Sequence, residues 1–328
     1  MSMLNEVSNI EQRLADSDAG VRRVAVLELP YSDVEETLPL LVKAMTDSDA
    51  AVRLEAAKAL EGLEEPPAVA ALLSALHDGN EEVRQAAALS LAELKQDLHA
   101  PMLLAALENA LKNSPENSSE NSEPFVLASV LHALRELRAA QAYTPAMQAL
   151  QHASPLVRRA AVGVLGYLKN PAALGALTRI ASNDADANVR RTAVGALGFA
   201  AEAEVLPALI TALSDDSWQV REEAAGTVGK LQLSGADTQL IGAMDDEYWQ
   251  VRVKAARSLG RMKVVAALSA LIAALAHSMS NLRKEAAIAL GEIGGSRAVA
   301  ALEVALDDPD PDVRKIAKLA LLQISKAV

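Results

Sequence analysis

A short pattern returns at a nearly constant interval along this chain of 328 residues. The letters WQVR occupy positions 218–221 and again 249–252, each time with acidic residues before them and Ala-Ala shortly after. Self-similarity with a period of roughly 20–50 residues is typical of repeat architectures, and it overrides interpretations based on single elements. This repeat therefore constrains the fold more than any other feature of the sequence.

The pattern occurs ten times and covers nearly the whole chain. We take the residue before the Arg, or before Leu127 in the fourth copy, as the anchor. The anchors are Val21, Val52, Val83, Val126, Val157, Val189, Val220, Val251, Leu282 and Val313. Successive anchors are 31 or 32 residues apart, except for a gap of 43 between Val83 and Val126. A unit of this size cannot bury its own apolar side, so neighbouring units must stack.

Each repeat is predicted to contain two helices. Small or apolar residues stand four, five and eight positions after the anchor, as in Ala56, Ala57 and Leu60 after Val52, which is one stripe of a helix. We call this the A helix. A second apolar stretch, such as residues 205–213, predicts a B helix. With one B helix at the start and one A helix at the end, the prediction is an all-α solenoid of about ten helix pairs and about 20 helices, forming a single array over residues 1–328.

Several recurring residues have structural explanations. An Asp five positions before the anchor and the Arg after it recur together, which predicts a ladder of pairs along the turns between repeats. Polar residues three positions before the anchor are predicted to cap the A helices: Asp18, Asp49, Asn80, Ser154, Asp186, Ser217 and Asp310. In five consecutive repeats a Gly stands nine positions after the anchor, where a helix ends or a neighbour comes close. In the last helix Lys318 replaces an apolar residue, as expected of an uncovered end.

The pattern Asp-x-x-x-x-Val-Arg-x-x-x-Ala-Ala-x-x-Leu-Gly, as at residues 215–229, resembles the short HEAT-like repeats of phycobilisome lyase subunits and bacterial scaffold proteins. The resemblance extends from about residue 4 to 328. It implies a solenoid fold, but repeats of this kind serve unrelated functions. The lyases act on bilins and on client proteins with cysteines, and no residue here matches bilin handling.

One segment interrupts the array. Residues 112–124, KNSPENSSENSEP, are polar and acidic, so a flexible insertion loop is predicted between the third and fourth repeats. The fourth repeat also has Asn121 and Leu127 in place of the usual Asp and Arg. Two interpretations fit this pattern: a change of superhelical twist near residue 124, or sequence drift with a tolerated insertion.

Composition excludes several classes of function. Without cysteine the chain has no disulfides and no thiolate chemistry. Residues 1–124 carry 9 Lys and Arg against 23 Asp and Glu, a net charge of −14, and this acidity disfavours nucleic acid as a partner. No signal peptide and no apolar run of membrane-spanning length is visible, so a soluble, cytoplasmic protein without membrane association is predicted.

The candidate partner-binding residues are Trp218, Trp249, Tyr248 and Arg179. The two tryptophans of the chain occupy the same place in adjacent repeats, so a short aromatic row is predicted near the turns. Exposed aromatic residues of this kind bind protein partners. The alternative is that each indole covers the preceding turn, with its N–H satisfied locally. Arg179, in the longer fifth repeat, is a further candidate on a B helix.

No catalytic group is predicted. The five histidines lack metal-ligand spacing, and His152 and His277 stand where other repeats have Asp, which indicates hydrogen bonds within turns. We therefore predict no catalytic, metal or cofactor site, and no cofactor. The predicted function is a non-enzymatic scaffold or adaptor that binds another protein, with an enzyme subunit among the conceivable partners. The alternative is an assembly or maturation factor, or a lyase-type accessory subunit, that presents a cofactor or an immature subunit to an enzyme.

Overall fold

The computed structural model describes residues 9–29, 34–113, 122–200 and 202–326. Within these residues the chain is all-α, with 20 helices and no strand, as predicted. It divides into two compact units, Met1–Leu168 and Lys169–Val328, which are described separately. The single array over residues 1–328 stays a prediction.

The helices alternate between two types, as the repeat predicts. The A helices are α2 (Ala19–Leu27), α4 (Ala50–Ala59), α6 (Glu81–Ala92), α8 (Ser122–Glu136), α10 (Pro155–Leu168), α12 (Ala187–Ala196), α14 (Trp218–Leu231), α16 (Trp249–Arg261), α18 (Ser280–Ile293) and α20 (Pro311–Lys326). The B helices are residues 9–13, α3 (Val34–Ala44), α5 (Pro66–Ala75), α7 (Ala100–Asn113), α9 (Tyr143–Ala149), α11 (Leu174–Asn183), α13 (Glu202–Ala212), α15 (Asp237–Gly242), α17 (Leu268–Ala274) and α19 (Ser296–Val304).

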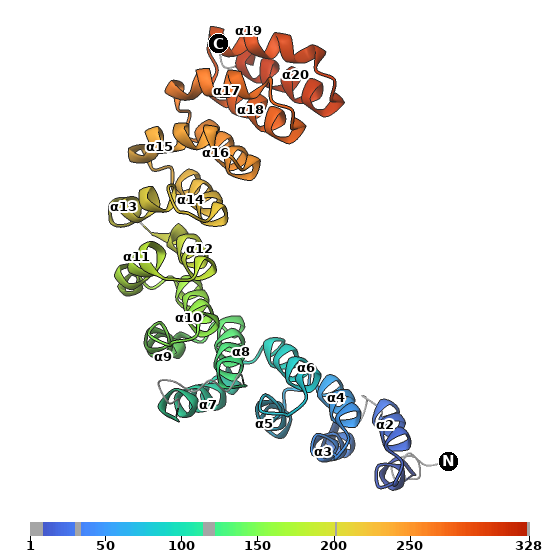
Figure 1. The fold of residues 1–328 in the computed structure, drawn as a ribbon. Coiled ribbons are helices and arrows are strands. Elements are labelled where there is room, and N and C mark those ends of the chain that lie inside the picture. The colour runs from blue at the N-terminus through green and yellow to red at the C-terminus, as the bar shows by residue number, and fades with distance from the viewer. Residues whose placement is uncertain (1–8, 30–33, 114–121, 201, 327–328) are drawn as a thin grey trace. The chain divides into compact units, whose positions relative to one another are not determined.

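Each unit has two layers. In the first unit α2, α4, α6, α8 and α10 pack in sequence, and in the second α12, α14, α16, α18 and α20 do the same. The B helices form the other layer of each unit (Figure 1). Short 3-10 turns extend many of the B helices, such as Ser234–Ala236 before α15 and Val265–Ala267 before α17. Each helix is therefore supported mainly by its neighbours in the chain.

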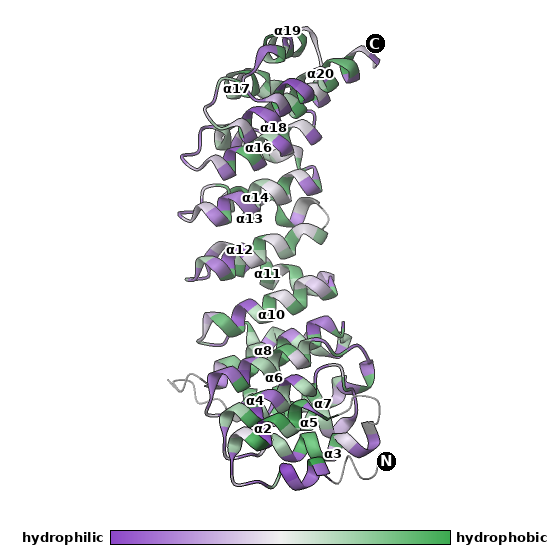
Figure 2. Cartoon of the chain, turned by 90° about the vertical axis from the view of Figure 1, so that its right-hand side faces the viewer, coloured by the Kyte–Doolittle hydropathy of each residue, from purple (hydrophilic) through white to green (hydrophobic). Residues whose placement is uncertain are grey.

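The core is built from small aliphatic side chains. Nine of the ten anchors are buried, and the alanines that follow them, such as Ala224, Ala255 and Ala286, are fully covered. Hydrophobic and hydrophilic residues share the same helices (Figure 2), because each helix has one face in the core and one in water. Lys318 is exposed at a position where the preceding repeats bury Ala256 and Ala287.

Most of the predicted helix caps are present. The side chains of Asp18, Asp49, Asn80, Asp186 and Asp310 accept backbone N–H groups of the first turn. Ser217 was predicted to do the same for α14, and that prediction is wrong. Its hydroxyl donates instead to Gln219 Oε1, at 2.8 Å, so the serine is engaged by a side chain of its own helix.

The repeated glycines allow close contact between A helices and do not end them. A Cβ on Gly229 would lie 2.8 Å from the Cα of Ser258, and one on Gly260 would lie 2.7 Å from the Cα of Ala289. Helices α14, α16 and α18 all continue beyond their glycine, to Leu231, Arg261 and Ile293. Of the two roles predicted for these glycines, close approach is therefore the one observed in α14, α16 and α18.

The insertion falls largely outside the described residues. Helix α7 extends to Asn113 and α8 begins at Ser122, so the ends of the segment 112–124 are helical. Asn121 and the rest of residues 114–121 lie outside the described part of the chain. The flexibility predicted for this loop remains a prediction.

Candidate protein-binding site

A ladder of ion pairs runs along the turns that lead into the A helices. In the rung that joins α14 to α16, Arg221 Nε lies 2.6 Å from Asp246 Oδ2, and Nη2 lies 3.1 Å from Oδ1. The remaining nitrogen, Nη1, donates to the carbonyl of Asp215 in the turn of its own repeat, at 2.7 Å. The same arrangement joins Arg22 to Asp47, Arg53 to Asp78, Arg190 to Asp215 and Arg283 to Asp308. The ladder predicted from the sequence is confirmed at these five rungs.

The ladder aspartates have lowered pKa values. The hydrogen bond from Arg53 lowers the pKa of Asp78, and the backbone N–H of Asn80 adds to this effect against the opposing cost of burial. Burial raises the pKa of Asp246, but Arg221 and the N–H of Tyr248 together outweigh it and bring the net value below the ordinary one. The carboxylates are thus held ionised, and the ladder is a structural feature with no sign of a catalytic proton transfer.

Two histidines take the turn position of the ladder aspartate. His152 Nδ1 accepts the N–H of Ser154, and His277 Nδ1 accepts the N–H of Met279, each at 3.0 Å. Burial lowers the pKa of His152, which favours its neutral form. Both rings therefore make the turn hydrogen bonds predicted from the sequence.

The aromatic residues gather at the start of α14 and α16. The ring of Trp218 stacks on that of Tyr248, with centroids 5.3 Å apart and an interplanar angle of 14°. The guanidinium carbon of Arg221 lies 5.8 Å from the centroid of Tyr248. The sequence predicted a row of two indoles, but the ring that stacks on Trp218 is the tyrosine of the next repeat. We call Trp218, Tyr248 and Trp249 the aromatic site.

The side chains of the aromatic site are partly exposed to solvent. Tyr248 retains 38% of its surface, while Trp218 and Trp249 are half-buried. Next to Trp249, the Oε1 atom of Gln250 is buried without a hydrogen-bond partner. Because the Trp218–Tyr248 stack bridges two repeats and includes a cation, it presents a rigid amphipathic surface.

The described contacts of Arg179 do not include any residue of the aromatic site. It is exposed on α11, where its backbone carbonyl accepts a hydrogen bond from Asn183 Nδ2. Among the described residues it makes no ion pair or ring contact with the aromatic site. Arg179 therefore lies on the surface of a B helix, and no described contact links it to the other candidate residues.

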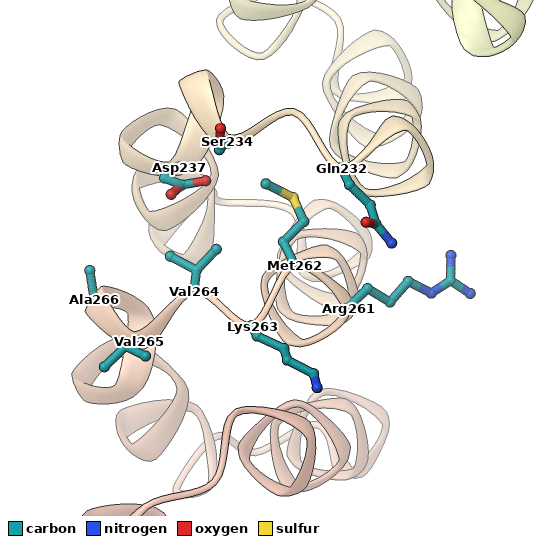
Figure 3. A pocket seen from close by; sticks show the side chains of 9 residues that line it. All are labelled: Gln232, Ser234, Asp237, Arg261, Met262, Lys263, Val264, Val265 and Ala266. Atoms are coloured by element: carbon teal, nitrogen blue, oxygen red, sulfur yellow. The ribbon is translucent and has the colours of Figure 1, made fainter. Parts of the chain in front are cut away.

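A cavity of about 560 Å³, which the sequence did not indicate, lies at the turns that follow α14 and α16. Its walls include Gln232, which caps α14, and Lys263, which follows the cap of α16. Both residues have a left-handed backbone conformation, with φ of 55° and 52°. Met262 and Val264 point toward Ser234 and Asp237, whereas Lys263 points away from them (Figure 3). One oxygen of Asp237 is buried without a partner. The lining is chemically mixed and selects no ligand class.

The described residues contain no group of three or more His, Asp or Glu side chains arranged to hold a metal ion. Every helix in this part of the chain also falls short of the length and apolar character needed to cross a membrane.

The family of the chain follows from these repeats. A family model of HEAT repeats matches residues 7–92, 117–186, 176–249 and 237–322. The chain belongs to the HEAT-repeat family. This confirms the HEAT part of the resemblance found in the sequence. The comparison of this HEAT-repeat protein with curated proteins gives no match.

Solved structures share the fold of this HEAT-repeat chain. An engineered protein is 21% identical over 98% of this chain and 99% of its own, with a TM-score of 0.52. The Escherichia coli protein YibA is 20% identical over 95% and 98% of the two chains, with a TM-score of 0.55. Yeast importin-β (Kap95p) is 14% identical over 99% of this chain but 51% of its own, with a TM-score of 0.65. At these identities the likeness concerns the fold alone.

Proposed function

We propose that this HEAT-repeat protein is a non-enzymatic scaffold that binds another protein through the aromatic site. The observation that carries the proposal is the Trp218–Tyr248 stack, which joins two repeats and keeps part of its surface accessible. Tryptophan, tyrosine and arginine dominate binding energy at protein interfaces, and this site combines all three. A stack that is already formed loses little conformational entropy on binding.

The structural relatives support the same class of function. Structures of Kap95p include complexes with RanGDP and with Nup1, so a solenoid of this architecture can bind proteins. The lyase-type alternative, presentation of a cofactor or an immature subunit to an enzyme, has no arrangement of described side chains in its favour. Arg179, exposed on α11, is proposed as a secondary contact, and the acidic first 124 residues as a region that attracts a basic partner.

The test is a pull-down with the full chain as bait, followed by the same experiment with variants. Trp218→Ala combined with Trp249→Ala should abolish recovery of the specific partner, because the stacked and half-buried ring surface is lost. Arg179→Ala should weaken recovery less.

A matched control is available in the first unit. Tyr167 is 42% exposed and lies under Arg138, with 5.7 Å between the guanidinium carbon and the ring centroid, much as Tyr248 lies under Arg221. Tyr167→Ala should leave recovery unchanged. Unaltered recovery with the double Trp variant, when circular dichroism shows it folded, would reject the aromatic site.

A further inference from the structure

Among the rungs whose two residues the structure describes, one has its arginine but lacks its carboxylate. In the described residues, Arg252 follows the anchor Val251, but the next turn offers His277 where the confirmed rungs have Asp. Asp246, the acid of the turn before, already has both carboxylate oxygens engaged by Arg221. We call Arg252 and His277 the unmatched rung.

Both members of the unmatched rung have unused donors. Arg252 Nε donates to the carbonyl of Asp246, and Nη1 and Nη2 have no acceptor among the described residues. His277 Nδ1 accepts a backbone N–H, so the neutral ring carries its proton on Nε2. Nε2 also has no acceptor in the described part of the chain. Arg252 and His277 thus hold the two chain positions that the confirmed rungs fill with a bidentate ion pair, and both keep donors without an acceptor among the described residues.

The location connects the unmatched rung to the aromatic site. Arg252 is one helical turn beyond Trp249 and Tyr248 at the start of α16, and both rung residues are half-buried. A charge-assisted hydrogen bond is stronger where water is partly excluded, and a planar guanidinium selects the planar carboxylate. A phosphate dianion is disfavoured, because Asp245, Asp246 and Glu247 form the preceding turn.

We infer that the unmatched rung is a binding site for a carboxylate, an Asp or Glu side chain of the partner that contacts the aromatic site. The partner completes the ladder by supplying the acid that His277 does not. This inference rests on the proposed function, and it specifies the chemistry of the partner: an acidic side chain next to an apolar or aromatic residue.

The direct test uses sodium acetate as a lone carboxylate. In spectra of the ¹⁵N-labelled full chain, the arginine Nε–Hε resonance of Arg252, assigned with Arg252→Lys, should shift saturably with acetate. It should not shift with sodium chloride at equal ionic strength. His277→Asp is the matched variant, because an internal carboxylate then occupies the place, and the acetate response should be lost.

Three results would overturn the inference: no acetate response beyond that of chloride, an equal response in His277→Asp, or a response to inorganic phosphate alone. The acetate titration contains no partner, so it fails or succeeds independently of the aromatic site. With the partner in hand, Arg252→Ala should weaken its Kd by roughly tenfold. Binding that survives Arg252→Ala unchanged but is lost with the Trp variants would retain the proposed function and reject the carboxylate site.

Discussion

Helices α4 and α6 in the first unit and α14 and α16 in the second are joined by the same hydrogen bond. Ser90 Oγ donates to the carbonyl of Ala57 at 3.1 Å, and Ser258 Oγ donates to that of Ala225 at 2.7 Å. The ends of the helices differ, however. Helix α4 ends at Ala59, before the exposed Glu61, whereas α14 continues through the equivalent Gly229.

The difference shows two solutions to one packing problem. Two A helices in contact can diverge at their ends, and a side chain of any size then fits there. Alternatively, they can stay in contact for another turn. The second solution requires a residue without a side chain, since a Cβ on Gly229 would lie 2.4 Å from the Cβ of Ser258. In the second unit, the helices that carry the aromatic site, α14 and α16, use the second solution.

The largest expected effect breaks this close contact. Gly229→Ala should lower the free energy of unfolding by about 3 kcal/mol, because the added methyl group meets the backbone of α16. Glu61→Ala, at the equivalent position, should change it by less than about 0.5 kcal/mol. Urea unfolding followed by circular dichroism measures both. Equal effects would show that the two helix pairs do not differ in the way described.

A second comparison concerns the rungs. Asp78→Asn removes the carboxylate that Arg53 binds through two nitrogens, and it should cost about 1–2 kcal/mol in the same urea experiment. The matched variant is Glu82→Gln, an exposed acid in the first turn of α6 without an ion pair among the described residues. An Asp78→Asn loss no greater than that of Glu82→Gln would mean that the rung contributes no stability.

The cost of Asp78→Asn should depend on pH. Because Arg53 holds the pKa of Asp78 below its ordinary value, the stabilisation is complete above the unfolded-state pKa of about 3.9. It is lost as the pH falls through that value and through the lower folded-state pKa. Urea unfolding of the parent chain and the variant at pH 6 and at lower pH values should therefore show converging stabilities in acid. A difference that grows in acid contradicts the assignment.

The smallest expected effect is a gain. His277→Asp should raise the free energy of unfolding by up to about 1 kcal/mol, since Arg252 then obtains the partner that Arg221 already has. Thermal unfolding with and without 0.5 M NaCl, roughly enough to screen exposed charges, measures the gain and its electrostatic part. His77→Asp, a histidine outside the rungs, serves as the control. A destabilised His277→Asp would indicate that the imidazole has packing contacts that an aspartate cannot replace.

The sequence predicted the parts of the fold that follow from spacing. The interval between anchors determined the alternation of A and B helices and their number, and the Asp and Arg positions predicted rungs such as Arg53–Asp78. These predictions succeed because a helix of fixed pitch turns a sequence interval into a position in space.

What the sequence did not predict is the direction of individual side chains. The row of Trp218 and Trp249 stays a prediction, but the sequence did not indicate that the ring of Trp218 stacks on Tyr248, one residue before Trp249. Ser217 was expected to cap α14, but Gln219 engages its hydroxyl. In both cases a side-chain torsion decides between neighbours of similar chemistry, and a sequence interval carries no information about it.

Each arginine of the confirmed rungs binds two turns at once, and this affects local unfolding of the chain. Arg53 holds the carbonyl of Asp47 in its own turn while it binds Asp78 in the next one, so neither turn can unfold without releasing the other. Adjacent repeats then exchange their amide protons together, as one cooperative segment. Between α16 and α18 this coupling is absent. It is also absent between α8 and α10, where Leu127 and His152 replace both members of the rung, so local opening should start at these two places.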